Sequence, residues 1–82
     1  MVTVKFFASF REKIGKSEIK LSTKGETTLE NVIEVLDKKI PGLKKMIEEG
    51  NAVVALNDEV AAENAVVKES DEIAIFPPVS GG

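Results

Sequence analysis

The sequence predicts an α+β domain in which one main helix packs on a mixed β-sheet. Apolar residues alternate with other residues near both ends of the chain, which is typical of half-buried strands. A segment in the first half repeats apolar residues with helical spacing, and a continuous apolar run follows it. With 82 residues, 43% of them hydrophobic, the chain can form one small domain with a modest core.

The first two strands are predicted to form a hairpin. Residues 2–7 alternate, with Phe7 on the outward face. The inward residues are Val2, Val4 and Phe6. A polar stretch containing Gly15 leads to Ile19 and Leu21, whose spacing predicts a second short strand paired with the first.

The main helix is predicted to begin at a capping box, in which Thr27 is the N-cap and Glu30 stands three residues later. Its apolar face repeats at i, i+3, i+4, i+7 and i+11. The residues of this face are Leu29, Val32, Ile33, Leu36 and Ile40. Pro41-Gly42 ends the helix, and residues 43–47 predict one or two further helical turns that stop at Gly50-Asn51.

The second half of the chain predicts the rest of the sheet. Residues 52–56 form a continuous apolar run, which indicates a central strand buried on both faces. Asn57-Asp58 turns the chain into a brief strand at 59–61, and a short apolar patch at 65–67 follows. Residues 72–76 predict the last strand, whose side chains alternate between the two faces. Ile73 and Ile75 point inward, Ala74 and Phe76 outward.

The composition excludes several kinds of function. The chain has no Cys and no His, so it lacks thiolate chemistry, the usual neutral-pH base and the commonest metal ligands. A net charge of −3, with no Trp or Tyr, argues against binding to nucleic acid. Glu48-Glu49, and Glu69 with Asp71, are interpreted as solvated loops rather than a metal site. No signal peptide or membrane span is visible, so we expect a cytoplasmic protein that has no membrane partner and is not an enzyme by itself.

A short tail follows the last strand, so the chain is divided into a domain at 1–76 and a tail at 77–82. Two prolines favour an extended path, and at about 3.1 Å per residue the tail reaches roughly 19 Å. Gly81 and Gly82 carry no side chains, so the terminal carboxylate can enter a narrow pocket. The alternative interpretation is a frayed end. Prolines that directly follow a well-patterned strand, in a chain without conventional catalytic side chains, favour a functional tail.

The segment 76–82, Phe-Pro-Pro-Val-Ser-Gly-Gly, resembles the C-terminus of the small subunit of molybdopterin synthase, in the MoaD-like family of ubiquitin-fold sulfur carriers. The resemblance covers essentially the whole chain, including residues 6–15, 54–57 and 71–74. It implies a β-grasp (ubiquitin-like) fold with a flexible Gly-Gly tail. One position departs from the family pattern, because Ser70 stands where the family usually has Gly. The sequence leaves open whether this turn needs a residue with a positive φ.

The resemblance implies a sulfur carrier for synthesis of the molybdenum or tungsten cofactor. An E1-like adenylyltransferase would use ATP to adenylate Gly82, and a sulfur donor protein would convert the adenylate to a thiocarboxylate. The carrier, which binds no cofactor itself, would insert its tail into the large subunit of molybdopterin synthase, in a complex with two copies of each subunit. Its sulfur would go to the pterin precursor, and Gly81 would provide clearance. The residues that would give the tail its reach are Pro77, Pro78, Val79 and Ser80.

The strand phases predict an apolar partner-binding surface beside the tail. Phe7 and Phe76 point outward from the terminal strands, and the resemblance implies that these strands pair and that Val60 joins them. The alternative is that both phenylalanines cover a second small core. Arg11 either pairs with a carboxylate of a partner or is a solvated side chain.

Three other functions stay open. A ubiquitin-like protein modifier, of the small archaeal modifier type, shares the fold and tail and would be joined to lysines or supply sulfur for tRNA thiolation. A carrier of the thiamine pathway is less favoured, because those chains are usually shorter and lack the Phe-Pro-Pro stem. A ubiquitin-fold adaptor would bind through its sheet and never use its tail.

Overall fold

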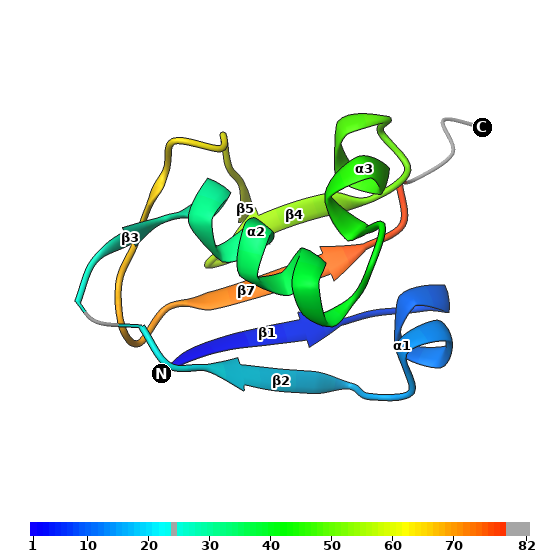
Figure 1. The fold of residues 1–82 in the computed structure, drawn as a ribbon, viewed down its shortest axis with the longest axis horizontal. Coiled ribbons are helices and arrows are strands. Elements are labelled where there is room, and N and C mark those ends of the chain that lie inside the picture. Colours follow the sequence, from blue (N-terminus) through cyan, green and yellow to red (C-terminus); the bar gives the residue numbers. More distant parts are fainter. Residues whose placement is uncertain (24, 79–82) are drawn as a thin grey trace.

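The computed structural model describes residues 1–23 and 25–78, and Figure 1 shows how its helices and strands are arranged. The elements in chain order are β1 (Val2–Phe6), α1 (Ser9–Ile14), β2 (Glu18–Leu21), β3 (Thr27–Thr28), α2 (Leu29–Lys39), α3 (Leu43–Glu48), β4 (Val53–Leu56), β5 (Glu59–Val60), β6 (Val66–Val67) and β7 (Glu72–Phe76). The predictions for Val79, Ser80, Gly81 and Gly82 lie outside the described residues.

Five strands form one mixed sheet in the order β2-β1-β7-β4-β5. β1 and β7 are parallel, whereas the pairs β1–β2, β7–β4 and β4–β5 are antiparallel. In Figure 1, β1 and β7 run side by side through the middle of the sheet. The predicted mixed sheet, the pairing of the first two strands and the pairing of the terminal strands are therefore confirmed.

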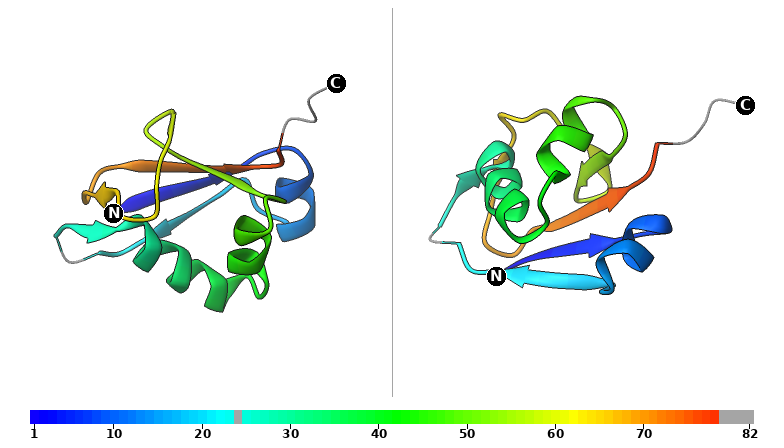
Figure 2. Two further views of the ribbon diagram at one scale, coloured as in Figure 1. Left: turned by 90° about the horizontal axis from the view of Figure 1, so that it is seen from above. Right: turned by 45° about the vertical axis from the view of Figure 1, so that its right-hand side comes forward.

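The core lies on one face of this sheet. In β1 and β7, the positions predicted to point inward are buried, and their neighbours are half-buried or exposed. Figure 2 shows α2 and α3 packed against the inward face. The buried residues of α2 are Leu29, Val32, Ile33 and Leu36. In β4, the neighbours Val54 and Ala55 point to opposite faces and are both buried, so the predicted two-sided burial of this strand is confirmed.

The main helix begins one position later than predicted. Thr28 is the N-cap, because its hydroxyl accepts a hydrogen bond from the Asn31 backbone N–H at 3.2 Å. Thr27 belongs to β3, pairs with Val67 of β6, and accepts a hydrogen bond from the Asn31 side-chain amide at 3.3 Å. The predicted capping box of Thr27 and Glu30 is therefore wrong, since strand pairing holds Thr27 before the helix.

Replacing Thr28 by Ala is expected to lower the free energy of unfolding by about 1 kcal/mol, because the Asn31 N–H at the start of the helix loses its acceptor. Thr27→Ala is the matched control and is expected to cost clearly less, since Thr27 accepts only from an exposed side chain. Urea denaturation of both variants measures the difference. Equal losses would contradict the assignment of Thr28 as the N-cap.

Three short elements carry no pattern from which the sequence predicts them. α1 has six residues, and Phe10 with Ile14 gives only one apolar pair at helical spacing, which is too short a pattern to predict a helix. β3 and β6 have two residues each and pair with each other in a separate small sheet. Alternation cannot be recognised in strands of this length. All three are local additions to the predicted order of elements.

The turn at 68–71 leads into β7 without a left-handed residue. The described non-glycine residues with a positive φ are Ala8, Asn57 and Asp58. Ser70 is not one of them, so a glycine is not required there. The Asp71 N–H donates to the Lys68 carbonyl at 3.0 Å, and the Lys68 N–H donates to the Asp71 carboxylate at 2.8 Å. These reciprocal hydrogen bonds close the turn.

The hydrogen bond from the Lys68 N–H, and next the one from the Asn57 side chain, hold the pKa of Asp71 below its usual value. We expect this carboxyl group to titrate in the folded protein below pH 3.9, the approximate value for an unfolded Asp. Because its pKa is lower in the folded state, Asp71 stabilises the fold above about pH 3.9, and this contribution is lost as the pH falls through the folded-state pKa. An NMR titration of the Asp71 carboxyl resonance measures the midpoint, and a midpoint at or above about 3.9 would contradict the expectation.

Candidate functional site

The candidate site begins where β7 ends. β7 lies between β1 and β4, so hydrogen bonds hold it on both sides. At its carboxyl end, Phe76 stands opposite Val53, and the Ile75 carbonyl accepts a hydrogen bond from the Phe7 N–H at 3.0 Å. The stem Pro77-Pro78 then passes from half-buried to exposed. The chain therefore leaves the domain from a strand that is fixed in the middle of the sheet.

A tight hairpin presents Val60 on the surface. Asn57 and Asp58 have φ angles of 49° and 70°, so both central residues of the β4–β5 turn lie in the left-handed region, as a type I′ turn requires. The Asn57 side chain also accepts a hydrogen bond from the Glu72 N–H at 3.0 Å, which ties the hairpin to β7. Val60 stands opposite Ala55 and is 75% exposed. The backbone of the hairpin thus holds the apolar side chain of Val60 in an exposed position.

Apolar residues from four segments share the sheet face opposite the core. Directly opposite residues in paired strands point to the same face, so the register aligns Ala74 with Ala55 and then with Val60. Phe76 and Val53 form the next row. Together with Phe7, which directly follows β1 and is 43% exposed, these residues are called the outer apolar surface. Its members are Phe7, Val53, Ala55, Val60, Ala74 and Phe76.

Charged side chains border the outer apolar surface on the β1 side. Lys5 and Glu72 form an ion pair with Nζ and Oε2 3.5 Å apart, and Lys5 stands in register with Ala74. Glu18 of β2 is opposite Lys5 on the other side. Both members of the ion pair are well exposed, so it contributes little to stability. An apolar centre with a charged border is the composition of protein–protein interfaces.

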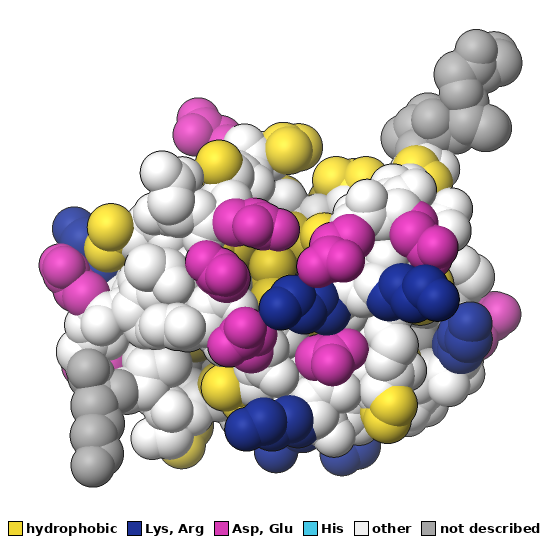
Figure 3. Space-filling view, turned by 45° about the horizontal axis from the view of Figure 1, so that its top comes forward, with side chains coloured by type: hydrophobic (Ala, Val, Ile, Leu, Met, Phe, Trp, Pro, Cys, Tyr) yellow, Lys and Arg dark blue, Asp and Glu magenta, His cyan; other side chains and the backbone are white. Residues whose placement is uncertain are grey.

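The space-filling view in Figure 3 shows both apolar and charged side chains on another side of the molecule. Hydrophobic side chains gather beside the end of the described chain, at the upper right of Figure 3. Acidic and basic side chains are interspersed over the helices below them. Exposed apolar side chains therefore lie at this end of the molecule as well as at other points of this view.

Arg11 lies on α1, which begins two residues after Phe7. The Phe7 carbonyl accepts a hydrogen bond from the Phe10 N–H at 3.1 Å, and Ala8 inside this turn has a φ of 53°. Phe10 is buried and anchors the helix, whereas Arg11 is exposed. Within residues 1–23 and 25–78, no ion pair involves Arg11. Both roles predicted for Arg11 are compatible with this position.

The structure places the three apolar residues that the sequence singled out, Phe7, Phe76 and Val60, on the same face of the sheet, with Val60 on the edge strand. The sequence reasoning missed three members of the surface, namely Val53, Ala55 and Ala74. The sequence places these residues in the apolar run at 52–56 and in the alternating last strand. Only the register between the strands shows that they lie beside Val60 and Phe76. The partner-binding role of all these residues stays a prediction.

Two negative findings apply to the described part of the chain. No group of three or more Asp or Glu side chains there is placed to hold a metal ion. No helix in residues 1–23 and 25–78 is long and apolar enough to cross a membrane.

A main helix on a mixed sheet, with parallel terminal strands in the sheet centre, defines a ubiquitin-like β-grasp protein. The predicted fold class is confirmed. The chain belongs to the ThiS family, whose sequence profile matches residues 4–82.

Individual relatives cover the chain almost completely. The molybdopterin synthase sulfur carrier subunit of Haemophilus influenzae is 42% identical over 82 residues, which are 100% of both chains. Small archaeal modifier protein 1 of Haloferax volcanii is 31% identical, over 95% of this chain and 97% of the relative. The crystal structure of SAMP1 from Haloferax volcanii matches this structure with a TM-score of 0.80 at 30% identity, and the match covers 99% of this chain and 98% of that chain. A chain in the complex of subunits 1 and 2 of the molybdopterin-converting factor from Helicobacter pylori has a TM-score of 0.67 at 28% identity, covering 99% and 97%.

Proposed function

We propose that this protein is the sulfur carrier subunit of a molybdopterin synthase and carries sulfur as a thiocarboxylate on Gly82. The observation that carries the proposal is the 42% identity, over the full length of both chains, to the sulfur carrier subunit of Haemophilus influenzae. The stem that leaves a strand fixed on both sides supports it, because a carrier must present its tail while its body stays folded. In this proposal, residues 1–76 are the domain and residues 77–82 are the working tail.

The proposed chemistry is carried by the terminal carboxylate. A carboxylate oxygen of Gly82 attacks the α-phosphate of ATP, and pyrophosphate leaves. Hydrosulfide supplied by the donor protein then attacks the acyl carbon, AMP leaves, and a C–S bond replaces the C–O bond to the nucleotide. The thiocarboxylate sulfur next bonds to a carbon of the pterin precursor, and water hydrolyses the resulting thioester, which leaves the sulfur on the precursor and returns the carboxylate. Gly81 gives clearance in the partner's active site, while Pro77, Pro78, Val79 and Ser80 give reach.

The proposed partners supply the catalytic side chains. The structural similarity to a chain in a complex of two molybdopterin-converting factor subunits supports a large-subunit partner, and the family resemblance suggests two copies of each subunit. An E1-like adenylyltransferase and a sulfur donor complete the set, and the need of the adenylyltransferase for ATP is consistent with a cytoplasmic protein. The outer apolar surface, with Arg11 beside it, is the proposed contact for these partners.

Intact mass spectrometry tests this function. The protein is incubated with its adenylyltransferase, ATP and a sulfur donor, and we expect a mass increase that corresponds to replacement of one oxygen by sulfur. Fragmentation is expected to localise the change to Gly82. The control reaction omits ATP and should leave the mass unchanged. If the mass stays unchanged while the partner enzyme is active on another carrier, the proposal is wrong.

A second candidate function is that of a protein modifier. The similarity to small archaeal modifier protein 1, in sequence and in structure, is the observation that favours it. A modifier would form an amide bond between Gly82 and a lysine amine of another protein, with loss of AMP from the same adenylate. Recovery of such conjugates from cells, with no thiocarboxylate detected, would favour the modifier over the sulfur carrier.

A further inference from the structure

The free edge of β2 presents unpaired backbone groups. β2 pairs with β1 alone among the described strands, and the Phe6 N–H donates to the Ser17 carbonyl at 2.9 Å. Hydrogen-bonded and non-bonded pairs alternate in an antiparallel ladder, so Ile19 and Leu21 also direct their backbone groups to β1. Glu18 and Lys20 therefore direct theirs away from the sheet, where they can pair with another extended chain.

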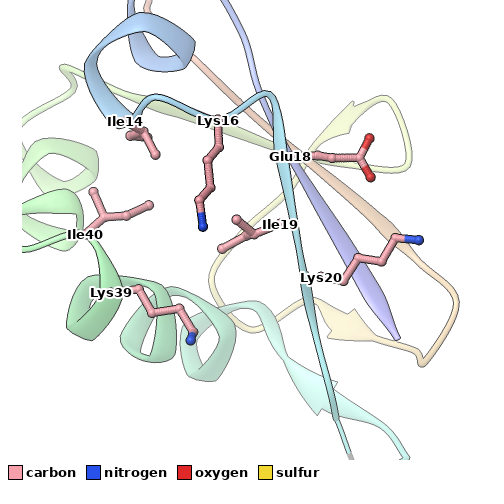
Figure 4. A pocket seen from close by; sticks show the side chains of 7 residues that line it. All are labelled: Ile14, Lys16, Glu18, Ile19, Lys20, Lys39 and Ile40. Carbon is pink, nitrogen blue, oxygen red and sulfur yellow. The ribbon is translucent and has the colours of Figure 1, made fainter.

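A hollow with an apolar floor lies next to this edge. It has a volume of about 600 Å³ and lies between β2, the end of α1 and the end of α2. In Figure 4, Ile14, Ile19 and Ile40 surround the space, and Lys16 points into it, while Glu18 and Lys20 project from the opposite side of the strand. A second hollow of about 340 Å³ adjoins it and shares Ile14, Lys39 and Ile40, and the two hollows together are called the groove.

The groove is basic although the chain as a whole is acidic. Lys13, Lys16 and Lys39 line it, and the ion pairs found among the described residues involve none of them. The single acidic lining residue is Glu18, whose side chain points away from the hollow. In a protein of net charge −3, three lysines around an apolar floor form a local positive patch.

We propose that the β2 edge and this groove bind an extended acidic segment of a partner protein by strand addition. The segment pairs with the backbone of Glu18 and Lys20, places alternate apolar side chains over the three isoleucines, and sets its carboxylates near Lys16 and Lys39. A second copy of this chain fits less well, because two edges joined by a two-fold axis would bring both sets of lysines together. None of the groove residues belongs to the outer apolar surface, so this binding is separate from the proposed sulfur chemistry.

The first test uses the synthetic peptide Glu-Glu-Ile-Thr-Val-Thr-Ile-Glu-Glu, capped at both ends, and amide NMR spectra of the full chain. We expect its saturable binding to move the signals of residues 14–21, together with those of Lys39 and Ile40. A peptide in which lysine replaces every glutamate is the control and should bind at least about tenfold more weakly. Perturbation confined to other residues, equal binding of the two peptides, or absence of binding would each overturn the proposal.

Two pairs of variants separate the backbone contribution from the charge contribution. Lys20→Pro removes an outward N–H while the hydrogen bonds to β1 stay, so it should weaken binding by about tenfold relative to Lys20→Ala. Lys16→Glu with Lys39→Glu should weaken it by about tenfold or more, whereas Lys45→Glu with Lys68→Glu, which changes the net charge equally outside the groove, should not. Equal affinities within either pair would overturn the proposal. So would a dimer, detected by analytical ultracentrifugation, that Lys20→Pro dissociates, because a second copy would then occupy the edge.

Discussion

A chain shortened by removal of Gly81 and Gly82 is expected to gain no sulfur, even with saturating adenylyltransferase, ATP and sulfur donor. The shortened chain still ends in a carboxylate, but at about 3.1 Å per residue that group would lie about 6 Å closer to the domain. It would also belong to Ser80, which carries a side chain, instead of to a glycine. We expect loss to the detection limit of intact mass spectrometry. This is the largest effect expected for any change in the chain.

The controls separate the chemistry of the tail from stability. Among the described residues, the buried ones lie between Val2 and Ile75, so the shortened chain should keep the urea midpoint of the full chain. Ser80→Ala keeps the length of the tail and should still accept sulfur. A shortened chain that accepts sulfur at the full rate would contradict the assignment of Gly82 as the residue that carries the sulfur. It would favour a role for the surface alone, as in an adaptor.

The second large effect is expected at the sheet surface. Val60→Asp is expected to weaken binding to the synthase large subunit by about 2 kcal/mol or more, which is about 30-fold in Kd. The reason is that a carboxylate would replace an exposed apolar side chain in the row formed with Ala55 and Ala74 and would have to be desolvated on docking. Because Val60 is 75% exposed, the fold should be unaffected. Isothermal titration calorimetry with the large subunit measures the change.

Val66→Asp is the matched control for this experiment. Val66 is also an exposed valine in a two-residue strand, at 52% exposure, but it belongs to the small sheet of β3 and β6. The charge change is identical, so a general electrostatic effect would weaken both variants equally. Equal weakening, or none at Val60, would remove the outer apolar surface from the interface.

Repeated patterns made most of the fold predictable from sequence. Val2, Val4 and Phe6 alternate over enough positions to give the phase of β1, and the helical repeat from Leu29 to Leu36 gives the buried face of α2. The start of α2 was misplaced because Thr27 and Thr28 offer the same side chain. Only the pairing of Thr27 with Val67, far along the chain, decides between them.

The candidate site also has a part that the sequence predicts and a part that it does not. The outward phases of Phe7 and Phe76 follow from local alternation, so both could be predicted. The row from Ala74 through Ala55 to Val60 depends on the register of three strands and on a two-residue turn with left-handed Asn57 and Asp58. A small residue such as Ala55 also gives no sign of which face it borders. Register is a long-range property, so one sequence alone does not reveal it.

The parallel ladder between β1 and β7 also determines how the domain responds to pulling. A force that acts on the tail along the axis of β7 would be resisted by the hydrogen bonds to β1 and β4, which run across that axis. Those bonds resist in shear and must fail together, whereas a strand peeled from an edge loses them one at a time. In the proposed function, a partner that pulls the tail along this axis would therefore load both ladders of β7 in shear.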